Sequence, residues 1–359
     1  MPPNKKITEI ELLSHLQEGG DLLAPLRINR VELNPLSTQD RGIDALVVAS
    51  LPDEEEAFRF VIEAKSSSTP KSVHGATAQA RAYVRQGEHP MILVPYLSPQ
   101  RLKELEHKKI SGIDLCGNGI VIIPERLIIF RTGNKNRYPE SRPLSNPYRG
   151  RSAMVGRALL VQAQYDTLSE LYDVIQESGA KLSLSQVSKA VKALEDELIV
   201  SSSGRAMRLK DPLRLLDRLG SEWRAPRAAK MALRLPEPLE SLSRLSHDER
   251  LKWAITGESS VTKYISFGQG RPLRVAVSNL RKAWEILDGD QEDIPNFADV
   301  ELIETSEAGF YFQNRCDPNE IRWASRLQTW IELHTGDGRQ QDAAREIRQQ
   351  IITRINQWQ

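Results

Sequence analysis

The 359 residues of this chain are too many for one compact core, so we expect two or three domains. Hydrophobic residues make up 40% and charged residues 27%, as in an ordinary soluble globular protein. No signal peptide opens the chain and no apolar run approaches the length of a membrane span, so we expect no membrane partner. Cys116 and Cys316 match no disulfide or metal-ligand spacing, which favours a cytoplasmic location.

The net charge of +1 conceals a basic middle. Residues 131–230 hold 18 Lys and Arg against 11 Asp and Glu, a net +7, so the remaining residues together carry −6. A basic centre between more acidic flanks indicates that the centre faces a polyanion such as DNA. The alternative is an arginine-rich surface with no such partner.

The N-terminal region has the pattern of a helix followed by three strands. Apolar residues at helical spacing predict a helix over 7–16, and alternation predicts a strand over 27–33. Two further strands are expected over the apolar run 42–49 and over 57–65, with the polar stretch between them forming the hairpin turn.

Three charged residues should meet where these last two strands pair. A strand has a side-chain period of two, so Glu63 and Lys65 project from the same face. Asp44 starts the preceding run, and pairing of the two strands brings it beside both. Hard oxygen ligands of this kind hold a magnesium-like ion, which acts as a Lewis acid and lowers the pKa of a bound water. The alternative is a salt bridge on an exposed strand face.

The pattern Ile43-Asp44 … Glu63-Ala64-Lys65 resembles the catalytic motif of the PD-(D/E)xK nucleases, which have the restriction-endonuclease-like fold. The usual proline before the aspartate is replaced by Ile43. The resemblance implies that Asp44, Glu63 and the Ala64 carbonyl bind Mg²⁺ or Mn²⁺, while Lys65 serves the attacking water. It also implies a glutamate near the metal on the first helix, for which Glu9 and Glu11 are both candidates.

The next elements follow the order expected of that nuclease core. We expect a helix over 73–86, a strand over 90–96 and a helix over 98–108, and then strands near 119–123 and 127–131. The resemblance places Gln79, on the first of these helices, near the phosphate. We assign residues 1–150 to this nuclease-like domain.

A basic, polar segment rich in Gly and Pro spans residues 131–152. One interpretation is a solvated linker. The other is a contact with a phosphate backbone, which needs donors and positive charge more than regular structure. The sequence leaves both open.

Residues 151–225 carry the pattern of a winged helix-turn-helix. Helical spacing over 153–164 and 168–178 is followed by a short turn, a third helix from Leu184 and a β-hairpin near 199–210. This pattern is similar to that of winged-helix transcription regulators, in which the third helix enters the major groove. The expected DNA-contacting residues are those on its polar face and in the wing: Ser185, Gln186, Ser188, Lys189, Lys192, Arg205 and Arg208. A winged helix used for protein contacts is the alternative.

Residues 226–359 predict a C-terminal α/β domain. Trp253 and Thr256-Gly257-Glu258-Ser259, together with residues 327–333 and Gly336-Asp337-Gly338, resemble the C-terminal region of AbiEi-type antitoxins of type IV toxin–antitoxin systems. That family pairs a winged helix with such a domain and regulates transcription. The glycines at positions 257, 336 and 338 of this chain match no phosphate-binding loop and are expected to be turn glycines, so we expect no cofactor other than the metal.

Together these patterns predict an α/β multidomain protein with a restriction-endonuclease-like mixed-sheet core, a winged helix-turn-helix and a C-terminal α/β domain. The function expected is that of a DNA-binding, metal-dependent endonuclease in a prokaryotic defence or mobile-element system. The alternative is a non-catalytic AbiEi-like antitoxin or transcriptional regulator that binds DNA and a partner protein. A protein partner and a homodimer both remain open.

Overall fold

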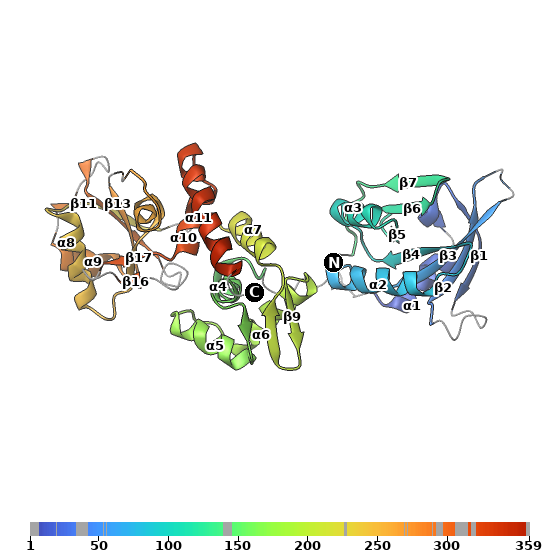
Figure 1. Cartoon of the computed structure of the whole chain (residues 1–359), viewed down its shortest axis with the longest axis horizontal. Coiled ribbons are helices and arrows are strands. Elements are labelled where there is room, and N and C mark those ends of the chain that lie inside the picture. The colour runs from blue at the N-terminus through green and yellow to red at the C-terminus, as the bar shows by residue number, and fades with distance from the viewer. Residues whose placement is uncertain are drawn as a thin grey trace. The chain divides into compact units, whose positions relative to one another are not determined.

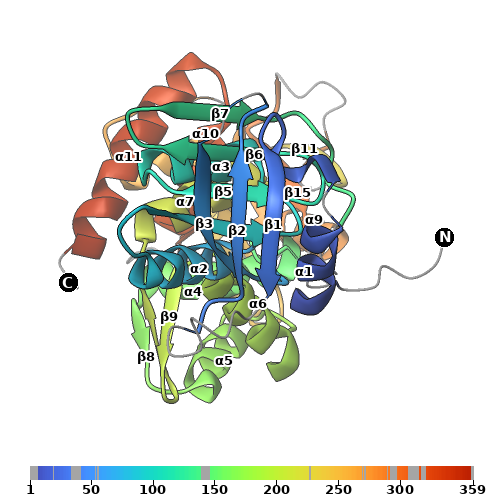
Figure 2. The ribbon, with the colours of Figure 1, turned by 90° about the vertical axis from the view of Figure 1, so that its right-hand side faces the viewer.

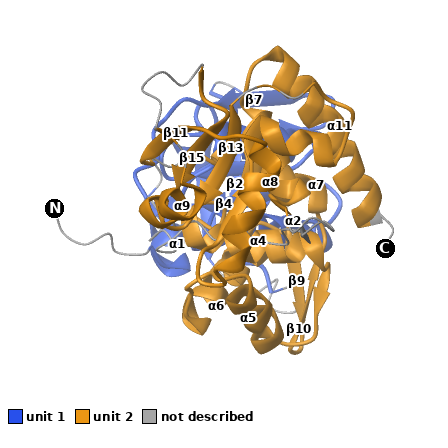
Figure 3. Cartoon of the chain, turned by 90° about the vertical axis from the view of Figure 1, so that its left-hand side faces the viewer, with its two compact units in different colours: residues 1–144 blue, residues 145–359 orange. Residues whose placement is uncertain are grey.

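The computed structural model describes residues 7–18, 20–33, 42–52, 54, 56–138, 146–225, 228–268, 270, 272–288, 290–291, 297–305, 315–316 and 321–356. The chain divides into two compact units, residues 1–144 and 145–359 (Figure 3). Both units combine helices with mixed β-sheets, so the expected α/β multidomain class is confirmed. The expected domain boundaries at 150 and 225 stay predictions.

Unit 1 is built on one sheet whose strands lie in chain order (Figure 1). β1, β2 and β3 form an antiparallel meander and stand side by side in Figure 2. β4 and β5 then continue the sheet in parallel to β3, and β6 and β7 follow as antiparallel strands at its other edge. The bounds are β1 Arg27–Leu33, β2 Ala45–Ser50, β3 Ala57–Ala64, β4 Glu88–Val94, β5 Ser111–Asp114, β6 Gly119–Ile123 and β7 Leu127–Arg131.

Helices cover both faces of this sheet. α1 (Glu9–Gln17) packs its apolar stripe against one face, in a core with Phe58, Phe60 and Ile62 of β3. α2 (Pro70–Tyr83) and α3 (Pro99–His107) cover the opposite face, in a core with Ile92 of β4. Burial on both faces explains why β3 and β4 are apolar over most of their length rather than strictly alternating.

Unit 2 begins with helices around a small three-stranded sheet. The elements are α4 Ala153–Val161, β8 Gln164–Tyr165, α5 Leu168–Glu177, α6 Leu184–Asp196, β9 Val200–Ser203, β10 Ala206–Leu209 and α7 Pro212–Glu222. β9 and β10 form a hairpin, and β8 pairs with the other side of β10. α5, α6 and the hairpin therefore follow one another as a helix, a second helix and a wing-like ribbon, which lie close together in Figure 1.

The rest of unit 2 forms a second sheet and further helices, of which α11 is the longest. The strands lie in the order β14-β11-β15-β13-β12-β17-β16. Their bounds are β11 Lys230–Arg234, β12 Trp253–Ile255, β13 Leu273–Val277, β14 Asp290–Gln291, β15 Val300–Glu304, β16 Arg315–Cys316 and β17 Arg322–Trp323. The helices are α8 Pro238–Ser243, α9 Leu280–Leu287, α10 Arg326–His334 and α11 Gly338–Asn356, with the 3-10 helix η5 over Gly257–Lys263.

The two parts of unit 2 share one hydrophobic core. Trp330 of α10 and Ile347 of α11 belong to the same buried cluster as Leu159 of α4 and Leu215 of α7. α7 approaches Trp330 so closely that a Cβ on Gly220 would lie 2.6 Å from the indole ring. The helices after the C-terminal sheet therefore pack on α4 and α7, which belong to the first part of the unit.

A buried polar network joins the same parts. The Arg157 guanidinium on α4 donates to the Gln328 side chain at 2.6 Å, and Gln328 donates to the Glu332 carboxylate at 2.6 Å. Glu332 also accepts from the Thr256 hydroxyl at 2.8 Å and the Gly257 N–H at 2.5 Å. The segments that resemble the antitoxin region thus meet inside the unit, where their polar groups satisfy one another.

Of the expected turn glycines, Gly257 has a turn conformation, whereas Gly338 is the first residue of α11. Gly257 has a φ of +59°, which favours glycine, and Asp337 accepts a hydrogen bond from the Gln340 N–H at 3.0 Å in the first turn of α11. Among the described helices, none is both long and apolar enough to cross a membrane.

We predict that Gly220→Ala lowers the free energy of unfolding of unit 2, by about 1–3 kcal/mol, because the rigid Trp330 ring cannot move aside. All six tryptophans lie in unit 2, so urea unfolding followed by Trp fluorescence reports on this unit. Gly338→Ala is the matched control, since nothing lies within 4 Å of its added Cβ. Equal stability of the two variants would contradict the close approach of α7 and α10.

Candidate active site and nucleic-acid interface

Asp44 extends the pairing of β2 with β3 by one side chain. The backbone ladder between these strands ends at the pair Ala45 and Ile62. Beyond it, the Asp44 carboxylate accepts a hydrogen bond from the Ala64 N–H at 2.8 Å. Alternation along the two strands puts Asp44 and Glu63 on the same face, as neighbours across the ladder.

Glu63 and Lys65 form an ion pair at the end of β3. The Lys65 ammonium lies 2.5 Å from Glu63 Oε1, and the Glu63 side chain is only 3% exposed. The second carboxylate oxygen of Glu63, Oε2, is buried and has no hydrogen-bond partner among the residues that the structure describes. The structure therefore brings Asp44, Glu63 and Lys65 together at one end of the sheet.

The two candidate glutamates of α1 differ in their surroundings. The side chain of Glu11 is held in a capping box with Thr8 at the start of α1. Glu9 is exposed, and its charge shifts the pKa values of Asp44, Glu63 and Lys65. Sequence reasoning left these two glutamates equal, because the choice depends on which one the helix cap occupies.

Burial dominates the electrostatics of the two carboxyl groups. Loss of solvent raises the pKa of Asp44, against the opposing effects of the Ala64 N–H and the Lys65 charge. Loss of solvent likewise raises the pKa of Glu63, although the Lys65 hydrogen bond opposes it. For Lys65, burial lowers the pKa, but the hydrogen bond to Glu63 and the surrounding carboxylates outweigh it and raise the pKa overall. Lys65 is therefore a cation at neutral pH.

Gln79 is not drawn into this cluster. It lies on the exposed side of α2, whose buried side consists of Val73, Ala76, Thr77 and Ala80. It makes no hydrogen bond to Asp44, Glu63 or Lys65. Its expected place near the phosphate stays a prediction that depends on where a substrate lies along α2.

The donor set fits a hard divalent cation. Two carboxylates and the adjacent Ala64 carbonyl supply oxygen ligands, and Glu63 Oε2 is buried without any partner among the described residues. In that part of the chain, no group of three or more His, Cys, Asp or Glu side chains is placed to hold a metal ion. A site made of two carboxylates and one carbonyl leaves other coordination positions for water and for a phosphate oxygen, as Mg²⁺ prefers.

Asp114 supports the same end of the sheet, although sequence reasoning did not single it out. This buried carboxylate accepts hydrogen bonds from the backbone N–H groups of Leu97, Cys116 and Asn118, each at 2.8 Å. It also accepts from the Asn118 side chain at 2.8 Å. The one signal in the sequence was an aspartate just before the turn Gly117-Asn118-Gly119.

The polar face of α6 is open to solvent. Val187, Ala190, Val191 and Leu194 are buried in the core of unit 2. The expected contact residues on the opposite face are all exposed: Ser185, Gln186, Ser188, Lys189 and Lys192. Gln186 has a second task, because its side chain accepts the Ser183 N–H at 2.8 Å in a capping box.

The hairpin after α6 adds further exposed cations. Gly204 turns the hairpin with a φ of +62°, and Arg205 and Arg208 are exposed at and beside this turn. Lys189 and Lys192 of α6 belong to the same stretch of unit 2. The electrostatic requirement for binding a phosphate backbone is therefore met by exposed side chains on consecutive elements.

The basic segment around residue 140 is partly engaged by the protein where it is described. The Arg131 guanidinium donates to the Leu22 carbonyl, and Arg137 donates to the Leu115 carbonyl at 2.6 Å. In unit 2, Arg149 forms an ion pair with Glu222 at 2.7 Å, and Tyr148 is buried. These contacts tie parts of the segment to the protein, but residues 132–137 and Arg149 are exposed, so both interpretations stay open. Residues 139–145 lie outside the described part.

Comparison of the chain with models of protein families, with curated proteins and with solved structures finds no match.

We predict that Asp44→Asn stabilises unit 1 at pH 7. Asparagine keeps an oxygen to accept the Ala64 N–H but removes a charge whose burial is unfavourable. Because the folded pKa of Asp44 is raised, this unfavourable effect is absent below the ordinary aspartate pKa of about 3.9, develops as pH rises above it and is complete above the folded pKa. An effect on the order of 1 kcal/mol raises Tm by roughly 2–4 °C.

The measurement is thermal unfolding by circular dichroism from pH 3 to pH 8, taking the transition that Trp fluorescence does not detect. Glu106→Gln, an exposed carboxylate on α3, should leave this transition unchanged. If the variant is no more stable than the wild type at pH 7, or if its gain in stability persists at low pH, the burial of the Asp44 charge is not unfavourable.

Proposed function

We propose that unit 1 is a metal-dependent phosphodiesterase that hydrolyses DNA, and that the helix-turn-helix part of unit 2 positions the DNA as a winged helix. The observation that carries this proposal is the buried, partly unsatisfied Glu63 beside Asp44 and Lys65. The antiparallel meander followed by a helix and a parallel strand supports it, since this is the order expected of the PD-(D/E)xK core.

Each residue has a role that follows from its position. Asp44, Glu63 and the Ala64 carbonyl would hold Mg²⁺ or Mn²⁺, which when bound supplies Lewis-acid stabilisation of the phosphate and a more acidic water. Lys65, fixed by Glu63, would donate a hydrogen bond to the attacking water or to the phosphate oxygen that gains charge. Water attacks phosphorus and loses a proton, the bond from phosphorus to the leaving sugar oxygen breaks, and that oxygen takes a proton from solvent.

Glu9 fits as an outer partner of the same centre. Its carboxylate acts on all three residues electrostatically and is exposed at the N-terminal end of α1. It would orient a water rather than hold the ion directly. A carboxylate in this place also raises the affinity of the site for a cation, because it adds negative charge next to Asp44 and Glu63.

A non-catalytic regulator is the second candidate function. The resemblance of residues 150–359 to AbiEi-type antitoxins supports it, as do the exposed cations of α6 and the wing. In that case unit 1 serves as a docking platform. The electrostatics of Glu63 favour catalysis, because a platform has no use for a buried carboxylate whose second oxygen lacks a hydrogen bond.

We predict that Asp44→Ala and Glu63→Ala each reduce Mg²⁺- or Mn²⁺-dependent cleavage at least about 100-fold, because each removes a ligand of the metal ion beside the reacting phosphate. DNA binding should be retained, since α6 belongs to the other unit. The measurement is cleavage of labelled single-stranded and duplex DNA and of RNA, with EDTA as the blank and Glu106→Ala as the control. If the wild type cleaves none of these substrates, the regulator function takes precedence.

We also predict that the salt dependence of DNA binding depends on α6. Each phosphate neutralised by a lysine contributes about 0.9 to the slope of log K against log[salt], so Lys189→Ala and Lys192→Ala should each lower the slope by about that amount. Fluorescence anisotropy over a range of salt concentrations measures it. Lys103→Ala, an exposed lysine on α3, is the matched control. Unchanged slopes in both α6 variants would mean that this helix does not lie on DNA.

A further inference from the structure

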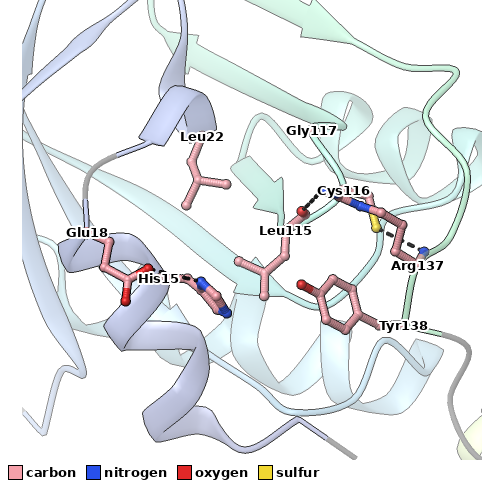
Figure 4. A pocket seen from close by; sticks show the side chains of 8 residues that line it. All are labelled: His15, Glu18, Leu22, Leu115, Cys116, Gly117, Arg137 and Tyr138. Atoms are coloured by element: carbon pink, nitrogen blue, oxygen red, sulfur yellow. Dashed lines mark hydrogen bonds and ion pairs between the residues drawn. The ribbon is translucent and has the colours of Figure 1, made fainter. Parts of the chain in front are cut away.

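A cavity of about 520 Å³ opens in unit 1 beside α1 and is not used by the mechanism described above. Figure 4 shows its walls. His15 comes from α1 and Leu22 from the segment after it, while Leu115 and Cys116 come from the turn after β5. Arg137 and Tyr138 follow the last strand of the sheet, and Glu18 and Gly117 complete the lining. The Glu18 carboxylate lies 3.4 Å from His15 Nδ1.

The walls of the cavity are fixed by hydrogen bonds. Asp114 holds the turn through the Cys116 and Asn118 N–H groups, each at 2.8 Å. The Arg137 guanidinium donates to the Leu115 carbonyl at 2.6 Å, and the Arg137 N–H donates to Cys116 Sγ at 3.3 Å. A turn and a strand extension that are tied together in this way make a preformed pocket rather than a gap between loose segments.

The cavity lies at the same edge of the sheet as the candidate active site, but on the opposite face, which α1 covers. β3, β4 and β5 run parallel, with Ala64 opposite Leu93 and Val94 opposite Asp114. The residues that follow β5 therefore emerge at the edge where β3 delivers Glu63 and Lys65. α1 links the two places, because Glu9 acts on the carboxylates and His15, about 9 Å further along the helix axis, lines the cavity.

The chemistry of the lining suits a planar heterocycle. Leu22 and Leu115 offer apolar surfaces, and Tyr138 and His15 offer flat rings. In Figure 4 the Tyr138 hydroxyl and the His15 imidazole point into the same space. A nucleobase needs a surface to stack on and a few donors and acceptors for its edge, and a pocket of this size has room for one base with its sugar.

We propose that this cavity binds one unpaired nucleobase of the strand that unit 1 cleaves. The proposal rests on the proposed nuclease function and names its substrate class as nucleic acid with an unpaired nucleotide close to the cleaved bond. A base within an intact duplex cannot enter, because it must first leave the stack, and unpairing is least costly where the base has no partner. Unit 1 therefore selects frayed, bulged or single-stranded sites.

The test compares two duplexes of one sequence, each carrying 2-aminopurine, either paired with thymine or without an opposing base. Binding to the full chain is measured in EDTA, so the result does not depend on cleavage. The wild type should bind the unpaired probe about tenfold more tightly, and its emission should change, because stacking of a base on an aromatic side chain supports a difference of that size.

Tyr138→Leu and His15→Ala should abolish the preference without changing the affinity for the paired probe. His107→Ala is the matched control, since His107 is exposed in the last turn of α3 as His15 is in the last turn of α1. Equal affinities of the wild type for the two probes, or a preference that survives in both variants, would overturn the proposal. If the wild type cleaves DNA but shows no preference for the unpaired probe, the nuclease function is supported and the base-binding cavity is contradicted. If it prefers the unpaired probe but cleaves nothing, only the nuclease function is contradicted.

Discussion

The burial of the Glu63 carboxylate is the constraint around which unit 1 is organised. A charged group held away from water is unfavourable unless it is paired and hydrogen-bonded, and Glu63 is paired only through Oε1 with Lys65. Asp44 and Glu9 add negative charge nearby, which makes the burial of Glu63 still less favourable. Under the proposed function, a cation bound by Asp44 and Glu63 would offset this unfavourable burial.

The topology of the sheet explains why so much chemistry collects at one edge. The meander of β1, β2 and β3 brings Asp44 next to Glu63, and the parallel strands β4 and β5 then deliver their own following turns to the same edge. Asp114 fixes one of those turns, and α1 supplies charge at one end and a cavity wall further along. In unit 2, the network from Arg157 to Glu332 holds α4 and the C-terminal helices together, and α6 packs in the same core.

The pairing of Asp44 with Glu63 was predictable because a strand has a fixed period and a short turn fixes the register. The exposed face of α6 was predictable for the same kind of reason, as its apolar spacing left Lys189 and Lys192 on the other side. The difference between Glu9 and Glu11 was not predictable, because it depends on a capping box at the start of α1. Nor was the fate of the basic segment, since whether Arg131 and Arg137 face solvent depends on carbonyl groups distant in the chain. Whether Gln79 serves the site depends on a substrate and not on the fold.

The most direct test of the account is the position of a bound metal ion. Crystals of the full chain soaked in Mn²⁺ can be measured at an X-ray wavelength where manganese scatters anomalously. We predict a peak within ligand distance of the Asp44 carboxylate, Glu63 Oε2 and the Ala64 carbonyl. Clear electron density for these three groups with no anomalous peak between them, at a Mn²⁺ concentration that supports cleavage, would contradict it.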